Sequence, residues 1–283
     1  MSSRSRSAAT DEMATADPHW FVKCDPCATE AVEKYNWLNA VAKSNGFQAP
    51  RGAVILRDGR QLVSLEFIPG FVPLQDLYIR HLLRKPTKPA FLSIMRDAGR
   101  ALGAIHAAEV PRHWTLHPLD SKLQDEARRY GLRSRTDAIP VPLHGDFGQM
   151  NVGIASATGA TVVLDPCANV ETTVGGHLVY GDPAIDLGQM LAFLEGELNS
   201  PAILLATPRR VCKAQAAFIE GYVEIRPEID LESAFAYSSA LMRLRMQSAG
   251  LLRSIVARML YNPARRNSTL QSKLAYFRRY ASV

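Results

Sequence analysis

The sequence predicts an α+β fold, in which strands and helices occupy separate parts of the chain. Two apolar runs on either side of Asp58-Gly59 predict an antiparallel hairpin before Gly70. A second pair of apolar runs, between residues 152 and 164, predicts another hairpin in the middle of the chain. From Ala184 onward the apolar residues recur at helical spacing. Strands and helices that cluster rather than alternate are typical of the α+β class.

The start of the chain predicts a tail rather than a targeting signal. Residues 1–18 are rich in Ser, Ala and Thr, have no apolar centre and include three acidic residues, so we interpret them as a disordered tail. The composition, 47% hydrophobic and 21% charged, is that of a globular protein. No run approaches the roughly 20 uninterrupted apolar residues of a membrane span. We therefore expect a cytoplasmic protein with no membrane partner.

The next segments predict a small sheet with one helix. Trp20–Lys23 is a short strand that ends in a lysine, and a helix is predicted after it, because its apolar residues are Ala31, Tyr35, Leu38 and Val41. The hairpin strands are 53–56 and 61–68, and Pro69-Gly70 ends the second one. Cys24 and Cys27 form a Cys-x-x-Cys pair, but no second pair completes a zinc site, so we expect reduced thiols.

Helices are predicted through most of the remaining chain. Apolar residues from Phe91 to Ile105 trace one face of a helix that ends near His106, which we expect to be a packed, hydrogen-bonded core residue. A short helix is predicted around 122–130. The later helical patterns are 187–194, 214–225 and 237–259.

The stretch from Val141 to Leu187 carries the chemistry. Asp146 and Asn151 lie five residues apart on a loop, and the hairpin that follows should return Asp165 to a place beside Asn151. A carboxylate near an amide oxygen, with a second carboxylate close by, suits Mg²⁺, a hard cation that takes oxygen ligands and shares them with substrate phosphates. Asp146 would then orient and deprotonate a hydroxyl. The alternative is that 144–151 is only a polar turn between strands.

At this point the sequence resembles a known family. His-Gly-Asp-Phe-x-x-x-Asn from His144 to Asn151, then Asp165 after a short strand, then Gly-Asp-Pro-Ala-x-Asp-Leu from Gly181 to Leu187, is similar to the aminoglycoside phosphotransferases. These are kinase-like enzymes that phosphorylate small molecules with ATP or GTP. The resemblance implies a protein-kinase-like two-lobed fold, with a small sheet lobe at 19–70 and a larger, mainly helical lobe at 71–283.

The resemblance also implies roles for individual residues. Lys23 would contact the nucleotide phosphates and pair with a helix glutamate, for which Glu30 is favoured over Glu33. The backbone of Glu66, Phe67 and Ile68 would bind the nucleotide base at the hinge between lobes. Asp186 would accept hydrogen bonds from the backbone of the 144–151 loop and take no part in the chemistry.

The chain departs from the family pattern at its start. Kinase-like folds place two strands and a Gly-rich loop before the lysine, whereas this sequence has no glycine before Gly46. The small lobe is therefore expected to be truncated, or the start codon is misassigned, or nucleotide is held differently or not at all. The alternative function is a kinase-like pseudoenzyme or ligand-binding protein.

The distribution of charge along the chain indicates which class of acceptor to expect. Residues 241–283 contain eight Arg and one Lys but no Asp or Glu, a block of +9 in a chain whose net charge is +6. Such a block can be a solvated face, a surface for an acidic partner or nucleic acid, or a pocket wall for an anionic acceptor. We expect a small-molecule hydroxyl acceptor that is neutral or anionic rather than polycationic, and we do not expect a nucleic-acid partner. Gly148 follows Asp146 at the place where protein kinases commonly carry a lysine, which also favours a small-molecule acceptor.

Overall fold

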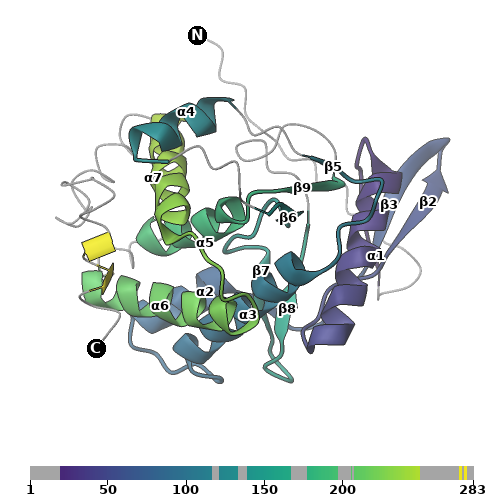
Figure 1. Ribbon diagram of the computed structural model, residues 1–283. Coiled ribbons are helices and arrows are strands. Elements are labelled where there is room, and N and C mark those ends of the chain that lie inside the picture. The colour runs from purple at the N-terminus through teal and green to yellow at the C-terminus, as the bar shows by residue number, and fades with distance from the viewer. Residues whose placement is uncertain are drawn as a thin grey trace, which may run out of the picture.

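The computed structural model of the chain describes residues 20–116, 121–132, 139–166, 177–196, 205, 207–248, 274–275 and 277–278 (Figure 1). Its strands are β1 (Trp20–Lys23), β2 (Gly52–Arg57), β3 (Arg60–Glu66), β4 (Phe71–Pro73), β5 (Thr115–Leu116), β6 (Val141–Pro142), β7 (Val152–Ala155), β8 (Thr161–Val163) and β9 (Val179–Gly181). Its helices are α1 (Ala28–Asn45), α2 (Leu74–Leu82), α3 (Phe91–Ala107), α4 (Ser121–Arg129), α5 (Ala184–Gly196), α6 (Pro208–Ile225) and α7 (Leu231–Ser248).

The first sheet has the strand order β1-β3-β2, and both of its pairings are antiparallel. The β2–β3 hairpin turns through Asp58 and Gly59, whose φ angles are 49° and 73°. Two consecutive positive φ angles match the right-handed twist of a hairpin, which is why the Asp-Gly pair is a strong turn signal. The predicted hairpin is therefore confirmed.

Helix α1 covers this sheet and links it to the rest of the molecule. Its first half contributes Ala28, Ala31 and Tyr35 to a small hydrophobic cluster with β3. Its second half contributes Leu38 and Ala42 to the main hydrophobic core. The helix ends at Gly46, whose φ of 75° lets its N–H bond the Ala42 carbonyl. In Figure 1, α1, β2 and β3 lie together at one end of the molecule.

Two further sheets of three strands each support the middle of the chain. The second sheet has the order β4-β7-β8, and its β7–β8 hairpin is antiparallel with Val152 opposite Val163. This is the predicted central hairpin. The third sheet has the order β5-β9-β6 and joins β6, just before the Asp146 loop, to β9, just before α5.

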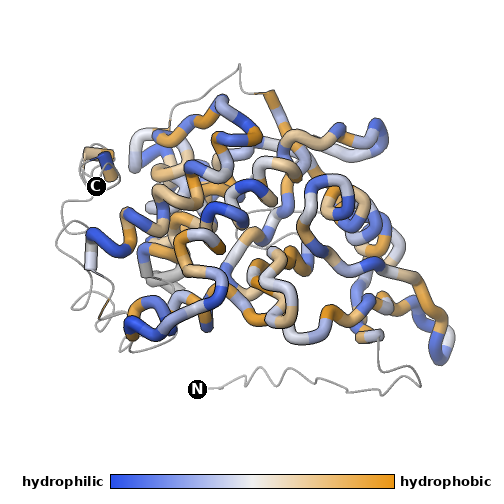
Figure 2. The backbone as a smooth tube through the Cα atoms, turned by 90° about the horizontal axis from the view of Figure 1, so that it is seen from below, coloured by the Kyte–Doolittle hydropathy of each residue, from blue (hydrophilic) through white to orange (hydrophobic). Residues whose placement is uncertain are grey.

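Helices α3 and α6 approach each other closely in the main core. A Cβ atom added to Gly99 would lie 2.0 Å from the Phe218 carbonyl oxygen, and one added to Gly221 would lie 1.9 Å from that of Arg96. Only glycine permits such an approach of two backbones. Figure 2 shows apolar and polar stretches alternating along the tube, as expected for elements with one buried face.

The predicted helices are confirmed within the described residues, and one helix was missed. The patterns at 91–105, 122–130, 187–194 and 214–225 correspond to α3, α4, α5 and α6. The 237–259 pattern corresponds to α7 up to Ser248, and the rest of that pattern lies outside the described residues. The predicted tail at 1–18 and most of the basic block at 241–283 also lie outside them. No prediction covered α2. None of the described helices combines the length and apolar character needed to cross a bilayer.

Candidate active site

The loop from Leu143 to Asn151, which we call the site loop, is held in place by side chains of α5. The Asp186 carboxylate accepts hydrogen bonds from the backbone N–H groups of His144 at 2.7 Å and Gly145 at 2.9 Å. One helical turn later, the Gln189 amide donates to the Gly145 carbonyl at 3.2 Å. Gly145 has a φ of 89°, so the loop turns in a conformation that favours glycine. The expected supporting contacts of Asp186 are therefore present.

Asp186 belongs to a buried polar network. His106 of α3 donates through Nε2 to Asp186 at 3.1 Å and accepts at Nδ1 from the Tyr222 hydroxyl at 2.9 Å. Burial alone would raise the pKa of Asp186, but the hydrogen bonds from His106 and from the Gly145 N–H lower it overall. Burial lowers the pKa of His106, whose ring is fully buried. Asp186 is thus held as a carboxylate, and His106 is the hydrogen-bonded core residue that the sequence predicted.

His144 connects the two ends of the candidate site. Its Nδ1 accepts the Asp146 backbone N–H at 3.2 Å, and its Nε2 lies 3.0 Å from the Leu164 carbonyl. The proton therefore belongs on Nε2, because a carbonyl can only accept. Burial, together with the nearby Lys34 charge, lowers the pKa of His144 to about 4, despite the opposing charge of Asp186. His144 is accordingly neutral near pH 7 and fixes Asp146 relative to the residue before Asp165.

Asp146 and Asn151 contact each other directly. The Asn151 amide nitrogen donates to the Asp146 carboxylate at 2.8 Å and to the Asp146 carbonyl at 3.0 Å. The amide oxygen of Asn151 is consequently directed away from Asp146. The Leu164 N–H donates to the Asn151 carbonyl at 2.7 Å, so the hairpin returns the chain to Asn151 as predicted, with Asp165 next.

Asp165 is held by two residues from the first sheet and α1. Lys23 Nζ lies 2.5 Å from its carboxylate, and the Tyr35 hydroxyl bonds the same oxygen. Lys23 also lies 3.1 Å from the Tyr35 hydroxyl, so the three groups form a closed set. Asp165 has a φ of 49°, which is uncommon for residues other than glycine but is adopted by aspartate more often than by most.

The remaining predicted residues lie near this set with other contacts. Glu30 accepts the backbone N–H of His177 at 3.4 Å, and the His177 ring lies 3.0 Å from the Asp25 carboxylate. Glu33 bonds the exposed His113 ring. The Lys23–Glu30 pair implied by the resemblance stays a prediction.

The hinge residues follow the first sheet. Glu66 ends β3, and its N–H donates to the Arg51 carbonyl at 2.9 Å, so that N–H is already bonded within the sheet. Phe67 and Ile68 lie between β3 and β4, and the Phe67 side chain is exposed. Base binding by this segment stays a prediction.

Sequence reasoning missed two α1 residues that contact the site. The helical spacing places Tyr35 in the apolar stripe of its helix, whereas its hydroxyl reaches Lys23 and Asp165. Lys34 has no predicted role, although its fully buried ammonium donates to the His144 carbonyl at 3.2 Å. A lysine within a buried helical stripe is the signal that could have found it, because lysine is almost never fully buried without a partner.

The donor set at the end of the hairpin suits a hard cation. Among the described residues, no group of three or more His, Cys, Asp and Glu side chains is arranged to hold a metal ion. An Asp–Asn pair is a smaller set, and Mg²⁺ is commonly bound by one or two carboxylates together with water and substrate phosphates. The oxygens of Asp165 and Asn151 therefore fit Mg²⁺ bound with a nucleotide, and they do not form a complete cage by themselves.

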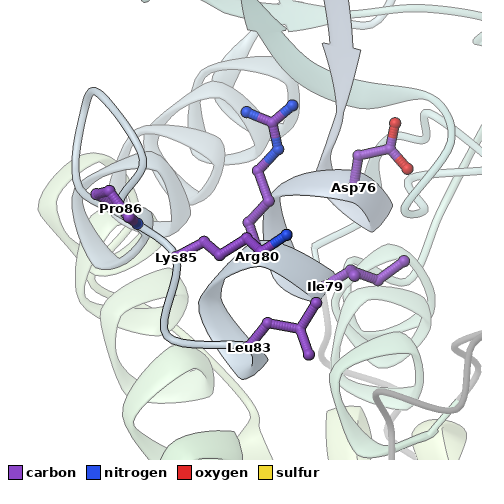
Figure 3. A pocket seen from close by; sticks show the side chains of 6 residues that line it. All are labelled: Asp76, Ile79, Arg80, Leu83, Lys85 and Pro86. Carbon is purple, nitrogen blue, oxygen red and sulfur yellow. The ribbon is translucent and has the colours of Figure 1, made fainter.

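A hollow of about 520 Å³ lies along α2 and the turn that follows it (Figure 3). Figure 3 shows its lining, which is Asp76, Ile79, Arg80, Leu83, Lys85 and Pro86. The Gln75 N–H at the start of α2 donates to the Gln149 carbonyl of the site loop at 3.2 Å. The beginning of α2 thus touches the site loop, and the hollow on the same helix is lined by two cationic side chains and one acidic one.

Comparison with known proteins identifies the fold. No family model and no curated protein sequence matches the chain. Among solved structures, the match to one crystal form of glucosamine kinase covers 93% of this chain and 72% of the kinase chain, with 14% identity and a TM-score of 0.53. Glucosamine kinase in complex with glucosamine, ADP and inorganic phosphate covers 87% and 70%, with 14% identity and a TM-score of 0.50. A GDP complex of a mutant aminoglycoside 2′-phosphotransferase covers 93% and 85%, with 14% identity and a TM-score of 0.50. The chain therefore has the α+β fold of kinase-like small-molecule phosphotransferases, and the predicted resemblance is confirmed at the level of the fold.

Proposed function

We propose that the protein transfers the γ-phosphoryl group of a nucleoside triphosphate to a hydroxyl group of a small molecule. The observation that carries this proposal is the hydrogen-bonded Asp146–Asn151 pair, in a loop whose peptide groups Asp186 holds. The fold supports it, because the structures with the same fold are small-molecule kinases.

Asp146 is the proposed base. Its backbone is fixed by the His144 ring and its carboxylate by the Asn151 amide, so the carboxylate has a defined direction before substrate arrives. A carboxylate held in this way can orient an acceptor hydroxyl and take its proton as the phosphoryl group transfers. Lys23 is the proposed phosphate contact, and its ammonium would add positive charge where negative charge spreads in the transition state. Glu30 would pair with Lys23 when nucleotide is bound.

Asn151 and Asp165 are the proposed Mg²⁺ ligands, through the amide oxygen and the carboxylate. Mg²⁺ bound with the nucleotide would neutralise charge on the phosphate oxygens. The carboxylate of Asp165 is 42% exposed, so it is reachable from solvent while Lys23 and Tyr35 contact it. These two residues would then shift or share their hydrogen bonds with it.

The proposed nucleotide site lies between two lobes. The small lobe would comprise 19–70, and its hinge residues Glu66, Phe67 and Ile68 would bind the base through backbone groups. The larger lobe would comprise 71–283. The separate hydrophobic cluster formed by α1 and β3 supports this division. Either ATP or GTP is compatible with it, since the structures of similar fold were solved with ADP or GDP.

The proposed acceptor is neutral or anionic. The hollow along α2 supports this, because Arg80 and Lys85 outnumber Asp76 on its lining. A polycationic acceptor would be repelled there, whereas a sugar or a metabolite with a carboxylate or phosphate would not.

The test is Asp146→Asn, with nucleoside diphosphate release measured in the presence of a panel of hydroxyl compounds. The panel would begin with glucosamine, a ligand in one of the structures of similar fold. Loss of the base should lower turnover by roughly 10²–10⁴-fold. Asp97→Asn is the matched control, since Asp97 is an exposed α3 residue paired with Arg100. It should leave turnover unchanged.

An Asp146→Asn variant with wild-type turnover would remove Asp146 from the mechanism. Nucleotide binding without transfer to any acceptor would instead favour the second candidate, a kinase-like binding protein without turnover.

A further inference from the structure

Two consecutive residues of α1 carry buried polar groups into the candidate site. The Lys34 side chain is fully buried and Tyr35 is 1% exposed. Both follow Glu30 on the same helix, by about one turn, and they contact different parts of the site. The rest of the buried face is Ala28, Ala31, Leu38, Asn39 and Ala42. Lys34 and Tyr35 are therefore the places where α1 makes polar contact with the site loop and with Asp165.

Lys34 holds the site loop at a different backbone group from the ones that α5 holds. Its ammonium donates to the His144 carbonyl at 3.2 Å and lies 5.9 Å from the centre of the Trp114 ring. Asp186 holds the backbone N–H of the same His144 at 2.7 Å. The two peptide groups that flank His144 are thus fixed, one by a carboxylate and the other by a cation. Burying an ammonium is costly unless it has partners, and the His144 carbonyl and the Trp114 ring are among the partners of Lys34.

Tyr35 completes the set around Asp165. Its hydroxyl can donate one hydrogen and accept others, so it donates to the Asp165 carboxylate and accepts from Lys23 at 3.1 Å. The same oxygen of Asp165 receives the Lys23 ammonium at 2.5 Å. Tyr35 therefore fixes the separation of the two charged groups that the proposed function assigns to the nucleotide phosphates and the cation.

We propose that Lys34 and Tyr35 are positioning residues through which α1 sets both halves of the site. Lys34 acts through the His144 peptide on Asp146, and Tyr35 acts on Asp165 and Lys23. The inference rests on the proposed function, but it adds two residues that the function does not require. It also predicts different kinetic effects for the two, because Lys34 serves the acceptor side and Tyr35 serves the nucleotide side.

The first test is Tyr35→Phe, which removes one hydroxyl and keeps the ring in the small cluster. Binding of ATP and of GTP is measured by calorimetry over a range of Mg²⁺ concentrations. Residues that support a metal ligand typically contribute 10–100-fold in metal affinity. We therefore expect the Mg²⁺ concentration for half-maximal nucleotide binding to rise about tenfold or more.

The control for Tyr35→Phe is Tyr78→Phe. The Tyr78 hydroxyl is also buried and donates to the Leu194 carbonyl at 3.0 Å, within the main core. This variant should lose similar stability and keep the wild-type Mg²⁺ dependence. If the wild type binds nucleotide and both variants match it, the role of Tyr35 is overturned while the proposed function stands. If the wild type binds neither nucleotide, the role of Tyr35 and the proposed function both fail.

The second test is Lys34→Met, which keeps the length of the side chain and removes its charge. The change leaves the buried His144 carbonyl without its Lys34 donor, so some thermal stability is lost whatever the role of Lys34. Kinetics therefore decide: we expect a fall of at least about tenfold in kcat and little change in the nucleotide KM. A purely structural lysine would lower stability and leave kcat unchanged. That outcome, or an equal change in KM, would overturn the role of Lys34.

Discussion

His144 shows how one residue can organise a site without performing chemistry. Its ring holds the Asp146 backbone with one nitrogen and the Leu164 carbonyl with the other. Its carbonyl and N–H are held by Lys34 and Asp186. The contact with the Asp146 N–H requires a neutral ring with the proton on Nε2, because protonation of Nδ1 would turn an acceptor into a donor facing that N–H. The protonation state of His144 is therefore a condition for the site loop.

This condition predicts that acid destabilises the fold. The pKa of His144 is about 4 in the folded protein and about 6.5 when it is unfolded. The unfolded chain thus binds more protons between these values, so this contribution to stability is complete above pH 6.5 and is lost as pH falls toward 4. The shift corresponds to about 3 kcal/mol. Burial lowers the pKa of His106 too, which adds a loss of the same sign.

Urea unfolding between pH 4 and 7.5 measures this effect. We expect the free energy of unfolding of the wild type to fall more steeply below pH 6.5 than that of His144→Gln, in which the side chain cannot be protonated. The difference between the two curves isolates His144 from the carboxylates that also titrate. His113→Gln is the control, because the His113 ring is largely exposed, and its curve should follow the wild type. Parallel curves for the wild type and His144→Gln would contradict the prediction.

At the scale of elements, the sequence predicts which face of a helix is buried but not what covers it. The apolar stripe of α3 identified its buried face, while its partnership with α6 depends on Gly99 and Gly221, which no periodicity singles out. The Asp58-Gly59 hairpin was predictable because its turn requires two positive φ angles that few residues adopt. The two-residue strands β5 and β6 were not, since pairings this short are set by their surroundings.

One helix that the sequence analysis does not predict nevertheless has a signal in the sequence. Helix α2 buries Leu74, Leu77, Tyr78 and Leu82, a helical spacing that could have been found. In the site, the spacing of Asp146, Asn151 and Asp165 was informative because a loop and a hairpin bring them together locally. Tyr35 and Lys34 reach the site across more than 100 residues of chain, so no local pattern could reveal their partners.

The close contact between α3 and α6 predicts that replacing glycine by alanine in α3 destabilises the protein, which is the reverse of the usual effect in a helix. In an exposed helix, Gly→Ala stabilises by about 1 kcal/mol. In Gly99→Ala the new methyl would meet the Phe218 carbonyl oxygen, a backbone atom that cannot rotate away. We expect a loss of about 1–3 kcal/mol in the free energy of unfolding, from the separation of the two helices. Chemical denaturation measures it, and a more stable variant would show that the helices are not this close.

Gly148→Ala is the control for this prediction. The nearest atoms to its added Cβ lie 3.9 Å away, an ordinary contact. Its effect on the free energy of unfolding should be small. The exposed pairs that Arg96 and Arg100 form with Glu220 and Glu224 flank the same contact, but surface ion pairs contribute little. The backbone approach at the two glycines is therefore the interaction under test.

At the scale of the whole molecule, α1 is the element that joins the small cluster to the main core. It contributes residues to both, and the site lies where it meets the site loop and Asp165. The small cluster buries few residues, so the sheet and α1 depend on contacts across the site for part of their order. In the structure, the Lys23–Asp165 pair is one of those contacts. A nucleotide bound with Mg²⁺ would bridge the same groups.

Nucleotide binding should therefore stabilise the whole molecule through Asp165. Calorimetric titration of ATP and GTP with Mg²⁺ into the wild type should show binding that is lost when Mg²⁺ is removed. It should also be lost in Asp165→Ala, which lacks both the proposed cation ligand and the partner of Lys23. A ligand at 100 times its Kd stabilises the folded state by about 2.7 kcal/mol, so the wild-type melting temperature should rise with nucleotide and that of the variant should not. Asp97→Asn should behave like the wild type. Equal binding by wild type and Asp165→Ala would mean that nucleotide is held elsewhere, and the proposed phosphoryl transfer at this site would then have to be abandoned.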